Sequence, residues 1–232
     1  RALGHTSGTI DRLEAIPGFR TDLSIDELIR QVKEIGLAVG AQTANLVPAD
    51  KKIYALRDAT ATVEVIPLIA ASVMSKKLAG GAEGILLDVK CGQGAFIKDL
   101  KQAKELALIM VEIGKSTGRK MTALITAMEE PLGKAVGEGV ETYEAIETLR
   151  GNGPADLVDL SLLIASHMVC LGSGMGILPM TAGISTTGET PVPQQAQVLI
   201  EPLKELLASG AALEKFRQMV IAQGGDSKVF DN

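Results

Sequence analysis

The chain has 232 residues, of which 46% are hydrophobic and 22% charged, a composition that suits a folded globular protein and argues against disorder over most of its length. The net charge of −5 argues against a broad nucleic-acid-binding surface, and no apolar run approaches the roughly 20 residues of a membrane helix, so we expect neither partner. The two cysteines, Cys91 and Cys170, have no metal-type spacing, which argues against a zinc site or disulfide scaffold and for a reducing, cytoplasmic setting.

Hydrophobic periodicity predicts a chain of alternating helices and strands. Capping residues and glycines mark several helix ends, as at Ser24 with Glu27 and at Gly36. The predicted helices are, in chain order, 25–35, a helix through 54–57 that starts near Pro48, 65–78, 100–113, 140–149, 157–171, 195–207 and 212–222. The predicted strands are 37–41, 84–89 and 121–126.

This order of elements predicts an α/β fold with a mainly parallel sheet. Residues 51–79 break the alternation, because two helices follow one another there without a strand between them. We interpret them as a segment of a separate helical lobe. The chain then divides into residues 1–47 and 81–232, which form an α/β lobe, and 48–80, which form the helical segment. Residues 172–193, rich in Gly, Thr, Ser and Pro, predict a long exposed loop.

Two clusters suggest a binding site. The Gly-, Ser- and Thr-rich run at residues 4–9 precedes a helix start, so it can offer N–H groups to an anion or can simply cap the helix. Ser72 and Lys76 lie four residues apart on a helix that is otherwise apolar, so they share a face, and Arg57 lies on the helix before it. The simpler interpretation of Lys76 is a side chain that reaches water near the helix end.

Other polar positions allow two interpretations. Asp88 and Lys90 end a predicted strand before a Gly-rich turn, which is either the ligand edge of the sheet or an ordinary connection. The turn at 131–137, with Glu144 downstream, can face a cation or be only a turn. His167 lies in an apolar helix, where a hydrogen-bonded core histidine is the expected role.

Five segments of the sequence together carry a resemblance. They are R-A-L-G-H-T-S-G-T at 1–9, Y-A-L-R-D-A-T-A-T-V at 54–63, S-K-K-L at 75–78, D-V-K-C-G-Q-G-A-F at 88–96 and P-L-G-K-A-V-G at 131–137. These segments are similar to motifs of the thymidine and pyrimidine-nucleoside phosphorylases, and the resemblance extends from residue 1 to about residue 226. Their combination is more specific than any one of them.

The resemblance implies a fold, an assembly and a reaction. The fold is a small all-helical lobe and a larger α/β lobe with a substrate cleft between them, and the assembly is a cytoplasmic homodimer built largely through the helical lobe. The enzyme is a pentosyltransferase that cleaves uridine, thymidine or deoxyuridine with inorganic phosphate as co-substrate, without an organic cofactor. The products are the free base and ribose or deoxyribose 1-phosphate.

The resemblance also assigns roles to residues of this sequence. Arg57, Ser72 and Lys76 match residues that hold the pyrimidine base, and the two cations match groups that stabilise it as it leaves. The remaining matches are Leu3, Tyr54, Ile69 and Phe96 as walls of the base pocket, Thr9 as a phosphate contact, and the carbonyls of Leu132 and Ala135 with the Glu144 carboxylate as a structural potassium site.

The sequence departs from the family pattern at several places. Ser7 replaces a glycine, and the segment 172–193 replaces a shorter connection. The phosphate motif K-H-S-T-G-G is expected upstream of Arg1, and a further domain is expected after Asn232, so we expect this chain to be a central fragment.

Three alternatives stay open at this point. One is a strict thymidine phosphorylase. Another is an enzyme of the anthranilate phosphoribosyltransferase type, against which the trio Arg57, Ser72 and Lys76 argues because it suits a pyrimidine edge. The third is a truncated homologue that binds a base or dimerises without turnover.

Overall fold

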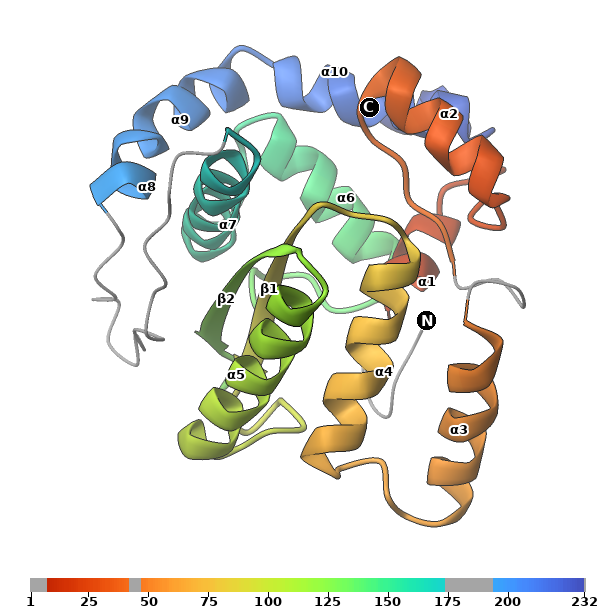
Figure 1. Cartoon of the computed structure of the whole chain (residues 1–232). Helices are drawn as coiled ribbons and strands as arrows, with labels where there is room; N and C mark the ends of the chain where they lie inside the picture. The colour runs from red at the N-terminus through yellow and green to blue at the C-terminus, as the bar shows by residue number, and fades with distance from the viewer. Residues whose placement is uncertain (1–7, 42–46, 174–193, 232) are drawn as a thin grey trace. The chain divides into compact units, whose positions relative to one another are not determined.

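The computed structural model, which describes residues 8–41, 47–173 and 194–231, confirms the predicted α/β fold (Figure 1). The chain forms two units, each with its own packing. Unit 1 contains Arg1–Thr43, Leu132–Leu162 and Glu201–Asn232, and unit 2 contains Ala44–Pro131 and Leu163–Ile200. The division of the chain into a helical lobe at 48–80 and an α/β lobe stays a prediction.

Unit 2 holds the sheet and the helices around it. Its elements are α3 (Pro48–Ala59), α4 (Ile66–Ala79), β1 (Gly84–Cys91), α5 (Leu100–Ser116), β2 (Lys120–Ala127), the second part of α7 (Ala155–Ser173) and α8 (Gln194–Val198). The two successive helices predicted within residues 51–79 are therefore confirmed as α3 and α4. Asp99 caps α5, since its carboxylate accepts hydrogen bonds from the backbone N–H groups of Lys101 and Gln102.

The strands β1 and β2 pair in parallel, as predicted, in a register that runs from Gly84 opposite Lys120 to Cys91 opposite Ala127. Alternate residues of β1, namely Ile85, Leu87 and Val89, are buried. Side chains of a strand point alternately to its two faces, so these three define the face that packs on the hydrophobic core. Apolar alternation in the sequence thus fixes which face of the sheet α5 covers.

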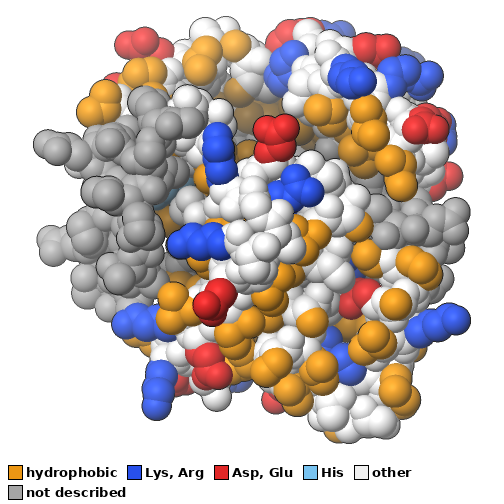
Figure 2. All heavy atoms as spheres, viewed as in Figure 1, with side chains coloured by type: hydrophobic (Ala, Val, Ile, Leu, Met, Phe, Trp, Pro, Cys, Tyr) orange, Lys and Arg blue, Asp and Glu red, His pale blue; other side chains and the backbone are white. Residues whose placement is uncertain are grey.

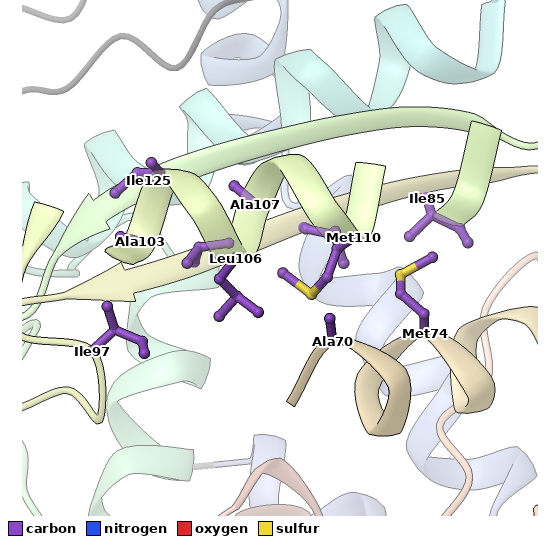
Figure 3. Close-up of a cluster of buried hydrophobic side chains, with 11 residues drawn as sticks. Ala70, Met74, Ile85, Ile97, Ala103, Leu106, Ala107, Met110 and Ile125 are labelled. Atoms are coloured by element: carbon purple, nitrogen blue, oxygen red, sulfur yellow. The ribbon is translucent and has the colours of Figure 1, made fainter. Parts of the chain in front are cut away.

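The core of unit 2 lies between this sheet face and the helices α4 and α5 (Figure 3). Met74 from α4, Met110 from α5 and Ile85 from β1 meet there. At Gly114, α5 approaches β2 so closely that a Cβ atom would collide with the Met121 side chain. The core therefore fixes α4, and with it the side chains that α4 presents on its other face.

Unit 1 is helical. Its elements are α1 (Thr9–Glu14), α2 (Ile25–Ile35), α6 (Glu138–Leu149), the first part of α7, most of α9 (Ile200–Ala208), α10 (Ala211–Ala222) and the 3-10 helix η1 (Ser227–Phe230). The predicted capping box of α2 is confirmed: Ser24 Oγ accepts from the Glu27 N–H at 3.2 Å, and the Ser24 N–H donates to the Glu27 carboxylate at 2.8 Å. Its buried apolar cluster is Ile16, Phe19, Met219 and Val220.

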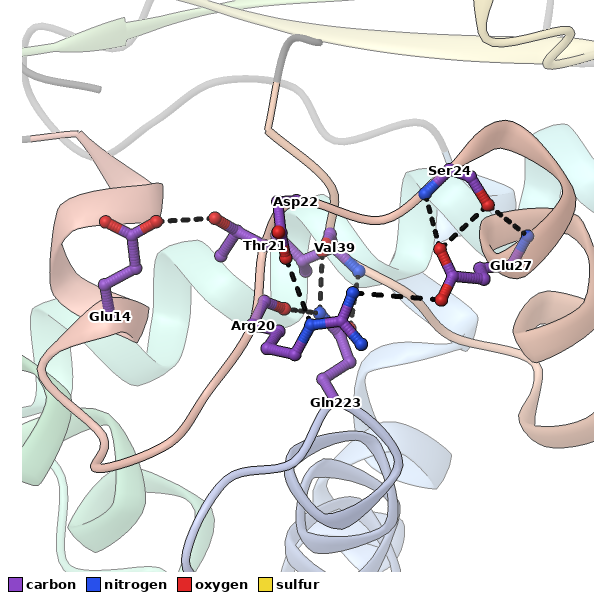
Figure 4. A network of polar contacts seen from close by, with 8 residues as sticks. All are labelled: Glu14, Arg20, Thr21, Asp22, Ser24, Glu27, Val39 and Gln223. Atoms are coloured by element: carbon purple, nitrogen blue, oxygen red, sulfur yellow. Dashed lines mark hydrogen bonds and ion pairs between the residues drawn. The ribbon is translucent and has the colours of Figure 1, made fainter.

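The predicted strand at 37–41 is wrong, since the described part of the chain offers this segment no partner strand. Its polar groups bond elsewhere. The Ala41 N–H donates to the Thr21 carbonyl at 2.7 Å, and Val39 bonds to the side chain of Gln223 (Figure 4). A side-chain amide has thus taken the place of a neighbouring strand.

The single helix predicted at 195–207 is also wrong, because α8 and α9 are separate and Leu199 lies between them. Pro202 explains the break, since proline has no N–H with which to bond the carbonyl of Val198 four residues earlier. Most of the loop predicted at 172–193 lies outside the described residues.

Among the described helices, α7 is long and apolar enough to cross a membrane, by length and composition only. The expectation that no apolar run approaches that length is therefore wrong for this helix. Only 22% of the stretch is buried, at residues such as Leu162, Ser166, His167 and Cys170. A core helix of a folded domain passes the same test, so α7 is weak evidence for a membrane span.

Candidate functional site

The candidate site is built on the two helices α3 and α4. On α3, Asp50, Tyr54 and Arg57 follow one another at helical spacing and so lie on one face. Arg57 is 4% exposed, and its guanidinium carbon lies 5.5 Å from the centre of the Tyr54 ring, within cation–π range. A buried cation is therefore fixed on this face of the helix.

The Arg57 guanidinium closes the connection between the helices. Its Nε donates to the Thr62 carbonyl at 3.2 Å, its Nη1 to the Leu68 carbonyl at 3.1 Å, and its Nη2 to the Val63 carbonyl. Among the described residues, these bonds use three of the five N–H groups of the guanidinium and leave two for another acceptor. Arg57 thus anchors the loop and can also bind a ligand oxygen.

On α4, Lys76 and Ser72 lie side by side, as predicted from their spacing. The Lys76 ammonium donates to Ser72 Oγ at 2.8 Å and to the Ser72 carbonyl at 2.9 Å. It also pairs with the Asp50 carboxylate at 2.5 Å. The Lys76 side chain is 31% exposed, so it reaches water as the simpler interpretation predicts, and its ammonium is in addition held by a carboxylate of α3.

Asp50 is not among the site residues that the sequence predicts. Its carboxylate is 10% exposed, whereas the Lys76 side chain is 31% exposed. The spacing of Asp50, Tyr54 and Arg57 on α3 was the available signal. Pairing across helices could not be inferred from it, because spacing along one helix does not say which helix it faces.

The electrostatics of the site depend on these few groups. Figure 2 shows Lys and Arg side chains scattered among acidic and hydrophobic ones on the face in view. Among the described side chains on α3 and α4 at this site, the Lys76 ammonium pairs with the Asp50 carboxylate, whereas the Arg57 guanidinium bonds backbone carbonyls. Attraction for a negatively charged group must therefore come from Arg57 and Lys76 themselves.

The predicted pocket walls are only partly described. Ile69 lies on α4, is half-buried and packs against the core of unit 2. Phe96 lies in the Gly-rich turn after β1 and is 41% exposed. Leu3 lies outside the described residues. The structure therefore joins Tyr54 to Arg57 through its ring contact but leaves the other wall residues as predictions.

The Gly-rich turn itself is held by backbone hydrogen bonds. The Gly94 N–H donates to the Met128 carbonyl at 2.8 Å, and the Gly92 N–H to the Ile97 carbonyl at 3.1 Å. Burial, helped by the charges of acidic neighbours, raises the pKa of the Cys91 thiol before this turn. A raised pKa favours the protonated thiol, so Cys91 is not an activated nucleophile.

Polar side chains gather at the carboxyl ends of the two strands. The Lys90 ammonium pairs with Asp88 at 2.8 Å and donates to Thr126 Oγ1 at 2.9 Å, while the Thr126 hydroxyl donates to Asp88 at 2.5 Å. Each of these groups forms a hydrogen bond or an ion pair with another of them, as in a structural network. Of the two interpretations of this edge, the contacts support the ordinary connection.

Thr9 begins α1 in unit 1 and is exposed. The Gly8 N–H before it donates to the Asp11 carboxylate at 2.9 Å, so this donor serves the helix start. The structure thus supports helix capping at Gly8, and the residues before it lie outside the described part of the chain. A phosphate contact at Thr9 stays a prediction.

The loop 131–137 bends around the Glu144 carboxylate. Its Oε1 accepts hydrogen bonds from the backbone N–H groups of Lys134 at 2.9 Å and Ala135 at 3.1 Å. Leu132 is exposed. Glu144 and Ala135 are therefore brought together as predicted for a cation site, but the contact observed is through an N–H group and not a carbonyl.

Asp156 holds the same loop from α7. Its carboxylate accepts from the Gly133 N–H at 2.9 Å, and this hydrogen bond is the main reason that the pKa of Asp156 is lowered. Among the described residues, no group of three or more His, Cys, Asp or Glu side chains could hold a metal ion.

His167 is buried in α7 at 1% exposure, next to Ser166 and near Cys170. Its Nδ1 has no hydrogen-bond partner among the described residues, so the expected hydrogen-bonded core histidine is not found there. Burial lowers the pKa of His167, because a charged imidazolium loses its hydration in the core. Cys170 is 1% exposed and is a small residue of the core.

Comparison with known proteins adds a family and relatives to this geometry. The family model described as "Glycosyl transferase family, a/b domain" matches residues 1–187. The chain is 48% identical over 232 residues to the pyrimidine-nucleoside phosphorylase of Geobacillus stearothermophilus. It is 49% identical over the same length to the protein of that name from Staphylococcus aureus (strain bovine RF122 / ET3-1). Each match covers 100% of this chain and 49% of the relative, so the chain spans about half the length of these curated relatives.

Proposed function

Because the chain belongs to the glycosyl transferase family with this a/b domain, we propose that it forms the base-binding part of a pyrimidine-nucleoside phosphorylase. The reaction is the phosphate-dependent cleavage of uridine, thymidine or deoxyuridine to the free base and ribose or deoxyribose 1-phosphate. The observation that carries the proposal is the Lys76 ammonium held against Ser72 on the side of α4 that meets Asp50 of α3.

The chemistry explains why these residue types are needed. A phosphate oxygen forms a bond to C1′ of the sugar while the bond from C1′ to the base nitrogen breaks and leaves its electron pair on the base. The negative charge spreads over the ring and its carbonyl oxygens. Arg57 and Lys76 stabilise that charge most when it has fully developed, which lowers the barrier more than it strengthens substrate binding. The Ser72 hydroxyl is suited to hydrogen-bond the ring N3 edge.

Further residues complete the proposed site. The contact of its ring with Arg57 supports Tyr54 as a wall of the base pocket. We propose the remaining roles on the resemblance: Leu3, Ile69 and Phe96 as walls of the base pocket and Thr9 as a phosphate contact.

A potassium ion bound by Leu132, Ala135 and Glu144 is part of the proposal. Carbonyl and carboxylate oxygens are hard donors that suit such an ion. The Glu144 carboxylate already lies against the backbone of the loop, which supports it as the anionic ligand, with its Oε1 occupied by two N–H groups. The ion would stabilise the loop and take no part in the reaction.

We also propose that the whole protein is a cytoplasmic homodimer. The helical segment 48–80 would belong to the lobe that forms the dimer, and the lobes would close over the substrate. Light scattering of the full-length gene product at several concentrations tests the dimer, and a constant monomer mass would contradict it.

The assay of the proposed reaction uses the full-length gene product with uridine or thymidine, each with and without phosphate, and follows free base by ultraviolet absorbance. Release from both nucleosides that requires phosphate is the expected result. Release from thymidine alone identifies a strict thymidine phosphorylase. Binding of uracil or thymine without turnover identifies a base-binding homologue and contradicts the proposed reaction.

The 232-residue chain is assayed in parallel. The chain covers 49% of the length of its relatives, so loss of turnover in this chain with retained base binding is expected. Turnover by the chain alone would mean that the residues described here suffice for phosphate binding as well.

A further inference from the structure

Among the described residues, the carboxylate of Asp50 is the one hydrogen-bonding partner of the Lys76 ammonium that comes from outside α4. It lies 2.5 Å from the ammonium, while the other two contacts are to Ser72, one turn earlier on the same helix. An ammonium has three N–H donors, so these three partners use all of them. Asp50 therefore decides where the ammonium points relative to α3.

Asp50 is itself well placed to hold a fixed position. It is the third residue of α3, where the helix dipole favours a negative charge. Its side chain is short, in contrast to the flexible four-carbon stem of a lysine. The rigid partner in this pair is the carboxylate, and the one that needs to be positioned is the ammonium.

The burial of the pair separates it from an ordinary surface ion pair. An exposed pair contributes little and varies in geometry. Here the carboxylate is 10% exposed, so removing its charge leaves a partly buried cation without its partner. Because Lys76 also donates to Ser72 Oγ, a displaced ammonium disturbs the hydroxyl as well.

We propose that Asp50 is a positioning residue of the leaving-base site: it orients Lys76, and through Lys76 the hydroxyl of Ser72, toward the departing pyrimidine. The proposal rests on the proposed function and adds to it a residue that the sequence resemblance leaves out. A carbonyl oxygen of the base would replace one of the two contacts with Ser72, while the contact with Asp50 is kept.

The kinetic test compares Asp50→Asn with wild type in the full-length gene product. A misplaced ammonium loses the interaction with the fully developed charge, so we expect kcat to fall by about tenfold or more while KM changes by less than about threefold. Asp50→Glu, which keeps the charge, should recover part of kcat. Glu105→Gln is the matched control, since it removes one carboxylate from an exposed position on α5 of the same unit. A rise in KM with unchanged kcat, or an equal loss in Glu105→Gln, overturns the proposal.

A second readout does not depend on activity. In protein labelled with ¹⁵N-lysine, the ammonium signal of Lys76 is assigned by its absence in Lys76→Gln. We expect that signal to shift and broaden in Asp50→Asn, because its N–H groups exchange faster once the carboxylate is lost, and to stay unchanged in Glu105→Gln. If Asp50→Asn does not fold, the signal should remain sharp but shift in Asp50→Glu. An unchanged signal in the folded variants contradicts the positioning role.

The kinetic and the NMR measurements together distinguish a failure of the proposed function from a failure of the positioning role. If the wild-type protein releases no base, the proposed function is wrong, and the ammonium signal alone decides whether Asp50 positions Lys76. If base is released and the signal does not respond to Asp50, the function stands and the positioning role is wrong.

Discussion

The side-chain amide of Gln223 pairs with both polar groups of the Val39 backbone (Figure 4). Its Oε1 accepts from the Val39 N–H at 3.1 Å, and its Nε2 donates to the Val39 carbonyl at 2.9 Å. The same amide bonds to the Arg20 carbonyl at 2.6 Å and to the Gln31 side chain at 3.1 Å. Gln223 is 2% exposed, so one buried side chain ties α10 to three segments near the start of the chain.

Replacing Gln223 with leucine should destabilise the protein by at least about 3 kcal/mol, since several buried donors and acceptors lose their partner at roughly 1–3 kcal/mol each. Urea unfolding followed by circular dichroism measures the loss. Gln218→Leu, on the same helix with hydrogen bonds at an exposed site, is the control and should change stability by less than about 1 kcal/mol. Equal effects of the two changes would mean that the buried network contributes little.

Two glycines with positive φ allow the cost of backbone strain to be separated from the cost of a steric collision. Gly18 has φ of 79° and Gly36 has φ of 86°, but a Cβ at Gly18 would lie 2.6 Å from the Gly224 carbonyl oxygen, whereas one at Gly36 would meet nothing within 4 Å. Gly36→Ala should cost about 1–2 kcal/mol from the left-handed conformation alone. Gly18→Ala should cost at least about 1 kcal/mol more, because the neighbouring backbone must move. Thermal unfolding of both variants checks the order, and a smaller loss at Gly18 would contradict it.

The buried His167 should make stability depend on pH. Burial lowers the pKa of His167 below the ordinary value of 6.5, so as the pH falls past that value the unfolded chain takes up a proton first. Stability is therefore full above about pH 6.5 and falls below it until the pKa of the folded state is reached. Urea midpoints at about pH 7.5 and about pH 5.5 measure the slope.

His167→Leu should reduce that slope, because the leucine does not titrate. The sequence contains two histidines, so His5→Gln is the natural control and should keep the wild-type slope. An unchanged slope in His167→Leu would assign the acid sensitivity to other groups.

Lys76→Gln should slow base release by about tenfold to a hundredfold or more, the equivalent of one lost charge-assisted hydrogen bond of roughly 1.5–3 kcal/mol. Lys77→Gln is a close control, since Lys77 is the exposed neighbour on the same helix, and it should stay within about twofold of wild type. Arg57→Ala should slow the reaction comparably and also loosen the loop that the guanidinium anchors. Wild-type rates in both Lys76→Gln and Arg57→Ala would refute their assignment.

The proposed cation site predicts an ion-specific effect. Potassium chloride should raise the melting temperature of the full-length gene product above its value in the same concentration of tetramethylammonium chloride, whose cation is larger than potassium and does not accept carbonyl or carboxylate ligands. Glu144→Ala should abolish this difference, and Glu138→Ala, at an exposed position of the same helix, should keep it. A difference that survives in Glu144→Ala would place the ion elsewhere.

The local structure of this protein follows from patterns in its sequence. Spacings within one segment predict the capping box at Ser24, the helices α3 and α4, and the shared face of Ser72 and Lys76. The periodicity of a helix or strand determines which of its residues lie on the same face, so patterns of this kind can be recognised in the sequence. The family motifs, read in the same way, pointed to the family that the comparisons then showed.

Which segments face one another depends on the tertiary packing. The pair of Asp50 with Lys76 joins two helices, and that of Val39 with Gln223 joins residues 184 positions apart. The local pattern at residues 37–41 predicts a strand. The segment forms none, because the buried amide of Gln223 bonds the backbone of Val39 in place of a neighbouring strand. The burial of His167, whose Nδ1 has no partner among the residues that the structure describes, depends likewise on what packs around α7. Such contacts follow from the packing of whole elements, which no spacing within a single segment encodes.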